Sequence, residues 1–289
     1  MQPEKGNPEI LVDEGVVCEA FRRAGCVSGD TVLIHGSLSS MGWVQNGPSC
    51  VFNGILAATA PGGTVAMPTL WHDGTEERSH PDRFDVHNSP AYNGALAEAL
   101  RKDSRSLRSR HFSHSISAMG SRAEELTCGH DCCGPAPSPW SETAFGVDSP
   151  WQRLYEWNAL YAFIGVDLTV CTLKHFIESR MVMRLLSLLS SDEERQARRA
   201  ELSRDCNHVL WPFLNGPHME EVLIRQGVLQ KTLLGSATLR SVRTRPLVEV
   251  LGQDIWQHPQ TWFSEDFLRW RERIQKKGAE DCLNKDIRQ

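Results

Sequence analysis

The feature that most constrains this chain is a strand–helix–strand pattern in its first quarter. Two short apolar runs rich in β-branched residues, Thr31–Ile34 and Thr64–Met67, are bounded by turn residues, which is typical of buried strands. Between them, Val51–Ala60 has helical spacing, and Pro61-Gly62-Gly63 turns the chain. Strands that alternate with helices favour an α/β domain with a parallel or mixed sheet.

The same patterning extends along the chain. It predicts helices over 10–25, 95–102 and 172–190, a further buried strand over 161–166, and a solvated charged helix over 192–204. Two polar stretches, 71–93 and 127–150, are dense in Gly, Pro, Ser or His, so we expect extended loops there.

Composition narrows the classes of partner. The formal charge is -5, from 36 acidic and 31 basic residues without a long run of either sign, which argues against a nucleic-acid partner and suits a cationic small molecule. No apolar run reaches the roughly 18 residues of a spanning helix, and the first residues are polar, so we expect a cytoplasmic protein with no membrane partner. Nine scattered cysteines, an odd number, predict reduced thiols.

One triplet has the spacing of a catalytic base and its partner. Thr172, His175 and Glu178 lie three residues apart on a predicted helix, so they share a face. A carboxylate fixes the tautomer of a neighbouring histidine, which then takes a proton from an attacking amine, while a hydroxyl stabilises a developing oxyanion. The alternative is a helix cap with a hydrogen-bonded histidine.

A second candidate is His35-Gly36-Ser37-Leu38, which follows a predicted strand. Small residues there let the backbone approach a ligand and offer N–H donors to a phosphate-bearing cofactor. An ordinary strand-to-helix turn has the same composition.

Soft metal ligands occur in two places, at His111 and His114 and at Cys128-x-His130-x-Cys132-Cys133. Neither has the spacing of a recognised zinc site, so we expect no metal, with a metal-dependent hydrolase as the alternative enzyme class. The serine-hydrolase and dinucleotide-binding motifs Gly-x-Ser-x-Gly and Gly-x-Gly-x-x-Gly do not occur.

Seven segments, in order, resemble the aminoglycoside 3-N-acetyltransferase family. They are GDTVLIHGSL (29–38), PGGTVAMPT (61–69), FD (84–85), GALAEALR (94–101), SRHFSHS (109–115), FGVDSPW (145–151) and TLKHFIE (172–178). The resemblance covers roughly residues 10 to 190. It implies a single domain over 1–289 with a three-layer α/β/α fold, a mixed sheet and helical additions, distinct from the commoner acetyltransferase fold. Residues 191–275 are then mainly a helical addition and 276–289 a polar tail.

The resemblance also implies a reaction: direct transfer of an acetyl group from acetyl-coenzyme A to the 3-amino group of an aminoglycoside, conferring antibiotic resistance without a metal. His175 is then the general base, Glu178 its partner and Thr172 a stabiliser of the thioester oxygen. The family's cofactor loop corresponds to His35, Gly36, Ser37 and Leu38, and His114 and Ser115 line the same cleft. Because aminoglycosides are polycations, we expect acceptor-binding carboxylates, with the candidates Asp73, Glu76, Glu77, Asp192, Glu193 and Glu194.

The chain also departs from the family's pattern at Gly36, Asp167, Cys171 and Leu173 and in its cysteine-rich loop 128–141. These departures leave two alternatives open: acetylation of another amine-bearing natural product, and a coenzyme A-binding protein without turnover. The oligomeric state does not follow from the sequence.

Overall fold

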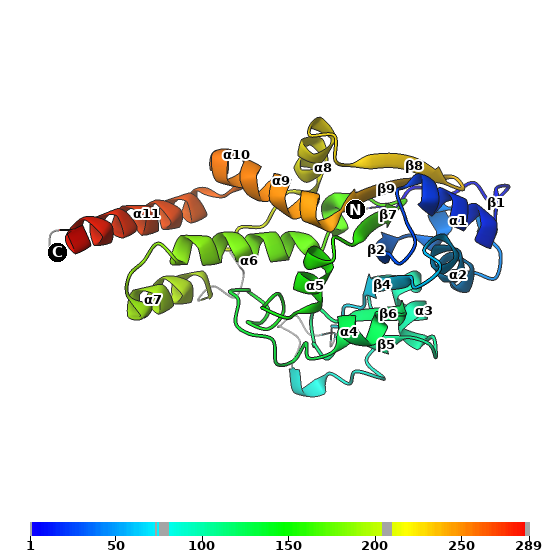
Figure 1. Cartoon of the computed structure of the whole chain (residues 1–289), viewed down its shortest axis with the longest axis horizontal. Helices are drawn as coiled ribbons and strands as arrows, with labels where there is room; N and C mark the ends of the chain where they lie inside the picture. The colour runs from blue at the N-terminus through cyan, green and yellow to red at the C-terminus, as the bar shows by residue number, and fades with distance from the viewer. Residues whose placement is uncertain (1, 73, 75–80, 204–209, 287–289) are drawn as a thin grey trace.

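The main sheet has seven strands of mixed direction, in the order β5-β6-β4-β2-β7-β9-β8, and lies in the right half of Figure 1. The computed structural model describes residues 2–72, 74, 81–203 and 210–286, with side chains to residue 280. The strands are β2 (Thr31–Gly36), β4 (Thr64–Pro68), β5 (Leu107–Arg108), β6 (Ile116–Gly120), β7 (Leu160–Ile164), β8 (Gln230–Leu234) and β9 (Ala237–Arg243). β2 pairs in parallel with β4 and β7, and the flanking strands are antiparallel.

Alternation along β2 sends side chains into two separate cores. Val32 and Ile34 point into one hydrophobic cluster, and Leu33 points into the other. Every residue from Thr31 to His35 is buried, as expected for a central strand covered on both faces. His35 shares the face of Leu33 because side chains alternate with a period of two.

Three helices form the layer on the Val32 face, namely α1 (Glu14–Arg23), α2 (Pro48–Ala58) and α3 (Ala95–Lys102). α1 and α2 cross closely, since a Cβ at Gly54 would lie 2.5 Å from the Cβ of Val17. A small parallel pair, β1 (Leu11–Val12) with β3 (Trp43–Val44), lies beside this layer.

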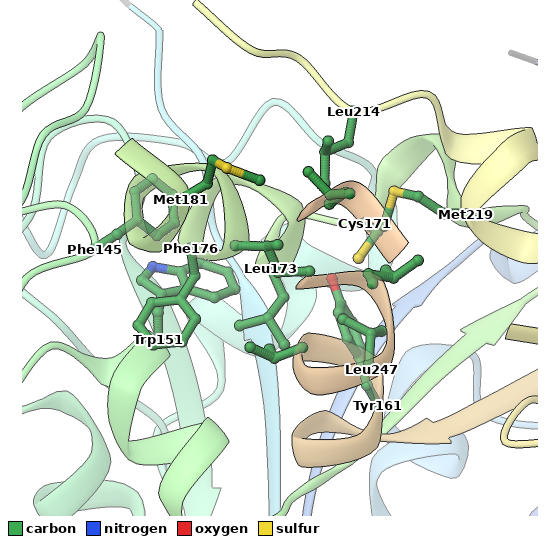
Figure 2. Packing of buried hydrophobic residues seen from close by; sticks show 14 of the residues in the cluster. Phe145, Trp151, Tyr161, Cys171, Leu173, Phe176, Met181, Leu214, Met219 and Leu247 are labelled. Atoms are coloured by element: carbon green, nitrogen blue, oxygen red, sulfur yellow. The ribbon is translucent and has the colours of Figure 1, made fainter. Parts of the chain in front are cut away.

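The opposite layer is larger and carries the hydrophobic cluster drawn in Figure 2. It contains α4 (Ala123–Thr127), α5 (Pro150–Glu156), α6 (Leu173–Leu186), α8 (Gly216–Arg225) and α9 (Thr244–Gln257). Around α6, Trp151, Phe176 and Met181 pack together, while Leu247 of α9 lies beside Tyr161 of β7 (Figure 2). The three-layer α/β/α fold expected from the sequence is therefore confirmed.

The last third is mainly helical, and it also contains two strands that the sequence analysis did not predict. Besides α7 (Asp192–Ser203), α10 (Pro259–Trp262) and α11 (Glu265–Asp286), it contributes the β8–β9 hairpin to the main sheet. Basic residues such as Lys231, Arg240 and Arg243 interrupt the apolar pattern of these strands. The sequence therefore does not show the apolar–polar alternation that is typical of a strand. α11 runs through the expected polar tail to Asp286 and buries Phe267, Trp270 and Ile274. None of the described helices combines the length and apolar character needed to cross a membrane.

Candidate active site

A cavity of about 620 Å³ opens where β2 and β7 end. Parallel strands that connect in opposite directions leave such a crevice at their carboxyl ends. Its lining comes from the segments that follow the two strands and from the start of α3: His35, Gly36, Ser37, Leu38, Val166, Val170, Asn93, Gly94 and Ala95 among others. The structure thus places all four residues of the expected cofactor loop in one cavity.

Two glycines shape this cavity. A Cβ at Gly36 would lie 3.0 Å from the Cβ of Ile164, which is closer than most real contacts. Gly94, the N-cap of α3, has φ +117 and nothing within 4 Å of a Cβ position. Because backbone N–H groups at a helix start attract anions, a phosphate group would fit against Gly94 and Ala95.

His35 connects the cavity to the start of α6. Its Nε2 lies 3.2 Å from the Oγ1 of Thr172, and both side chains are buried. The backbone N–H of Thr172 donates to the hydroxyl of Tyr161 at 3.1 Å. Burial, with a smaller contribution from the charge of Lys174, lowers the pKa of His35 to about 3, so His35 is a neutral imidazole at neutral pH.

One turn into α6, His175 and Glu178 form the pair that their spacing predicts. The Nδ1 of His175 lies 2.7 Å from Oε2 of Glu178. The side chain of Glu178 is completely buried, and that of His175 is 12% exposed. The carboxyl therefore fixes the imidazole's orientation from inside the protein, and the ring keeps some access to solvent.

A segment far along the chain holds the other side of Glu178. The Leu214 N–H donates to Oε1 at 2.7 Å, and the indole N–H of Trp211 donates to Oε2 at 3.2 Å. Burial raises the pKa of Glu178 to about 8, against the lowering effect of these two donors and of Lys174. The carboxyl is thus hydrogen-bonded on both oxygens and has a higher proton affinity than an exposed glutamate.

Aromatic rings surround His175. The ring centroid of Trp140 is 4.2 Å from that of His175, and those of His114, Phe145 and Phe213 are 5.8, 5.9 and 6.0 Å away. All but Phe145 meet the imidazole edge-on. These rings therefore limit the access of water to His175 and offer π faces to a cationic or aromatic group.

The two residues of the His114-Ser115 pair face different surroundings. The Nδ1 of His114 lies 2.8 Å from the Ser113 hydroxyl, and burial lowers the pKa of His114 well below its ordinary value. Ser115 donates to the carbonyl oxygen of Thr69 at 2.7 Å and accepts from Arg108 at 3.0 Å. His114 thus belongs to the surroundings of His175, whereas Ser115 joins a polar network beside β4.

The proposed acceptor carboxylates fall in two places. Asp73, Glu76 and Glu77 lie outside the described residues. Asp192 is at the exposed start of α7, where it pairs with Arg195 and lines a separate cavity. Glu193 accepts from Ser191 at 3.2 Å, and Glu194 lies 3.7 Å from Arg198. The three carboxylates thus contact residues of α7 itself and of the segment just before it.

Three aromatic residues at the site, Trp140, Trp211 and Phe213, escaped the sequence analysis. Each lies in an irregular stretch more than 30 residues from His175 in sequence, so neither period nor spacing connects it with α6. The available signal was a large apolar residue in a polar, proline-containing segment, which also fits an ordinary surface loop.

The soft ligands do not converge on one point. Cys128 and Cys132 are exposed thiols, and Cys133 is buried. His130 bonds Ser109 and the carbonyl of Ala144. In the part of the chain that the structure describes, no group of three or more His, Cys, Asp or Glu side chains is arranged to hold a metal ion.

Comparison with known proteins places the chain in a family. The family model for aminoglycoside 3-N-acetyltransferase matches residues 33–254, more than half of the chain. Aminoglycoside N(3)-acetyltransferase VII of Streptomyces paromomycinus is 30% identical over 170 residues, covering 54% of this chain and 56% of that relative. Aminoglycoside N(3)-acetyltransferase VIII of Streptomyces fradiae is 29% identical over 184 residues, covering 58% and 61%.

Solved structures agree on the fold. The crystal structure of aminoglycoside acetyltransferase AAC(3)-Xa superposes with a TM-score of 0.66 at 24% identity, covering 86% of this chain and 94% of that one. The binary complex of AAC-IIIb with CoASH superposes with a TM-score of 0.65 at 19% identity, covering 88% and 98%. The chain belongs to the aminoglycoside 3-N-acetyltransferase family.

Proposed function

We propose that this protein transfers an acetyl group from acetyl-coenzyme A directly to an amine, with the 3-amino group of an aminoglycoside as the acceptor. The observation that carries the proposal is the buried His175–Glu178 pair at 2.7 Å, beside a cavity formed by the cofactor loop of the family. Membership of a family whose relatives are named N(3)-acetyltransferases supports the reaction class.

The residues around the cavity fit coenzyme A. The absence of a side chain at Gly94 leaves room for a pantetheine arm, and the start of α3 offers N–H groups to a pyrophosphate. When bound there, acetyl-coenzyme A supplies the activated acetyl thioester. A related structure is a complex with CoASH.

Within this scheme His175 takes the proton of the attacking amine. With Nδ1 bonded to Glu178, the proton acceptor is Nε2. Because burial raises the pKa of Glu178 to about 8, the ionised form that stabilises the imidazolium gains population as the pH rises toward that value. Thr172, fixed by its contact with His35, donates its hydroxyl toward the oxygen on which negative charge develops. Neutral His35 leaves the Thr172 hydroxyl free of an adjacent positive charge.

The test is release of free thiol from acetyl-coenzyme A with gentamicin, apramycin and sisomicin, which related structures contain. Loss of a general base reduces the rate about 10²- to 10⁴-fold, so we expect His175→Ala to lose activity on that scale while still binding coenzyme A. His218→Ala is the matched control, because His218 also pairs with a glutamate three residues on but at the surface. Full activity of His175→Ala would contradict the mechanism.

The aromatic rings around His175 favour a second class of acceptor. Trp140 and Phe213 form edge-on contacts with the imidazole, and Phe213 is 39% exposed. This surface suits an amine that carries an aromatic ring, so benzylamine and tyramine belong in the same panel. Thiol release with these amines and none of the aminoglycosides would keep the chemistry and change the acceptor.

A further inference from the structure

A second cavity, of about 780 Å³, lies between α6 and α9. Apolar side chains of both helices line it, and Phe145 extends the lining from the loop before α5. Phe145, Phe176 and Met181 lie together at one end of the cluster in Figure 2. The volume is that of an ordinary small-molecule site, and the cavity shares no lining residue with the cofactor cavity.

Ser179 gives the cavity an unsatisfied polar group. The residue is 1% exposed, lines the cavity, and its Oγ has no hydrogen-bond partner among the described residues. A buried hydroxyl without a partner is destabilising because it has given up its hydrogen bonds to water, and a helical serine can avoid this by bonding the carbonyl one turn back. A polar atom of a bound molecule would satisfy it.

Gly252 widens the cavity from the side of α9. It sits inside a 14-residue helix, where glycine is less favourable than alanine. A Cβ built there meets nothing within 4 Å. Packing therefore gives no reason for a glycine at this position, and the space that it leaves is part of the cavity.

Two arginines set the charge of the cavity's rim. Arg184 stacks over Trp256 at 3.7 Å, and Arg180 lies over Tyr155 at 5.1 Å. Both arginine side chains are exposed, and neither forms an ion pair with a described carboxylate. The acidic residue of the lining, Glu249, accepts from the Tyr155 hydroxyl at 3.2 Å. The aromatic rings thus position two guanidinium groups whose N–H donors face no described anion.

We infer that this cavity binds a small amphipathic anion: a flat apolar body with one carboxylate. The body lies against Phe176, Met181 and Trp256 in the space above Gly252. The carboxylate meets the Ser179 hydroxyl together with the guanidinium groups of Arg180 and Arg184. The site is separate from the cofactor cavity and stands independently of the proposed acetyl transfer. Because Phe176 and Ser179 flank Glu178 on α6, an occupant contacts the helix that carries the His175–Glu178 pair.

The experiment compares two probes that differ only in charge, 1-naphthaleneacetate and 1-naphthaleneacetamide, by titration calorimetry on the full chain. We expect the acid to bind at least tenfold more tightly than the amide, with no loss of affinity when coenzyme A is saturating. Arg180→Gln/Arg184→Gln should abolish the difference between the probes. Arg22→Gln/Arg23→Gln on α1, which removes the same charge elsewhere, should preserve it.

Gly252→Leu tests the position of the site. The leucine enters open space, so we expect unchanged or higher thermal stability together with at least a tenfold loss of affinity for both probes. Equal affinity for acid and amide, displacement of the acid by coenzyme A, or parental binding by Gly252→Leu would each overturn the inference. So would a dimer in sedimentation experiments that Gly252→Leu dissociates, since the cavity would then bind a second copy of the chain.

Discussion

At the scale of single residues, Glu178 is the point on which the candidate site depends. It receives hydrogen bonds on both carboxyl oxygens from Leu214 and Trp211 and also contacts His175. His218 and Glu221 have the same spacing, but the Glu221 side chain is 73% exposed. Burial is therefore what distinguishes the two pairs.

Replacing Glu178 by glutamine should affect both stability and rate. The amide NH₂ opposes one of the donors that now face the carboxyl, so we expect the free energy of unfolding to fall by about 1–3 kcal/mol. The imidazole loses its orienting partner, and kcat should fall about 10²-fold or more. Urea unfolding and thiol release measure the two effects. Glu221→Gln is the matched control, and an equal loss in both variants would contradict the assignment.

How much of the site the sequence predicts depends on distance along the chain. His175 and Glu178 are three residues apart, so helical geometry alone brings them together. His35 and Thr172 meet only because β2 pairs with β7, and Trp211 reaches Glu178 from an irregular segment. The spacing of residues along the sequence carries no information on such contacts. The sequence therefore pointed to His35 as part of a loop but not to its contact with Thr172, and it did not point to Trp211 at all.

At the scale of elements, α1 and α2 can pack closely because Gly54 has no side chain. A Cβ there would lie 2.5 Å from the Cβ of Val17 and 2.8 Å from the carbonyl oxygen of Glu14. The predicted elements β2, β4, α2 and α3 of the first half formed, whereas β6 and the β8–β9 hairpin were not predicted. The difference is that basic side chains occupy the less buried positions of that hairpin at the sheet edge, such as Lys231 and Arg240.

Gly54→Ala and Gly252→Ala should therefore act in opposite directions. Alanine favours a helix by about 1 kcal/mol over glycine. At Gly252 nothing opposes that gain, and the free energy of unfolding should rise by about 0.5–1 kcal/mol. At Gly54 the overlap with Val17 should lower it by about 1–3 kcal/mol. Urea unfolding checks both. Partial rescue of Gly54→Ala by Val17→Ala is expected, and a stabilising Gly54→Ala would contradict the packing.

At the scale of the whole molecule, four buried histidines make the fold sensitive to acid. Burial lowers the pKa of His35 to about 3 and that of His130 to about 4, and it lowers those of His111 and His114 well below the ordinary value. In the unfolded chain each takes a proton below pH about 6.5. The unfolded state thus binds more protons, and stability falls as the pH drops.

Urea unfolding at pH 7.0, 6.0 and 5.0 should show this loss. Each histidine contributes at most about 1.4 kcal/mol per pH unit below pH about 6.5. Glu178 acts in the opposite sense, because its pKa is raised to about 8 and its contribution is lost as the pH rises toward that value. The four histidines outweigh it. His130→Gln should reduce the slope, and a pH-independent free energy of unfolding would contradict the expectation.

The position of β7 between β2 and β9 has a consequence for synthesis on the ribosome, because β9 is made much later than β7. Leu33 lies opposite Tyr161, and Tyr161 in turn lies opposite Val242. At about 5–20 residues per second, β7 therefore emerges several seconds before its second neighbour exists. Until then its apolar edge is open to other chains. Slowing translation after residue 164 should increase aggregation of the nascent protein more than slowing it after residue 243.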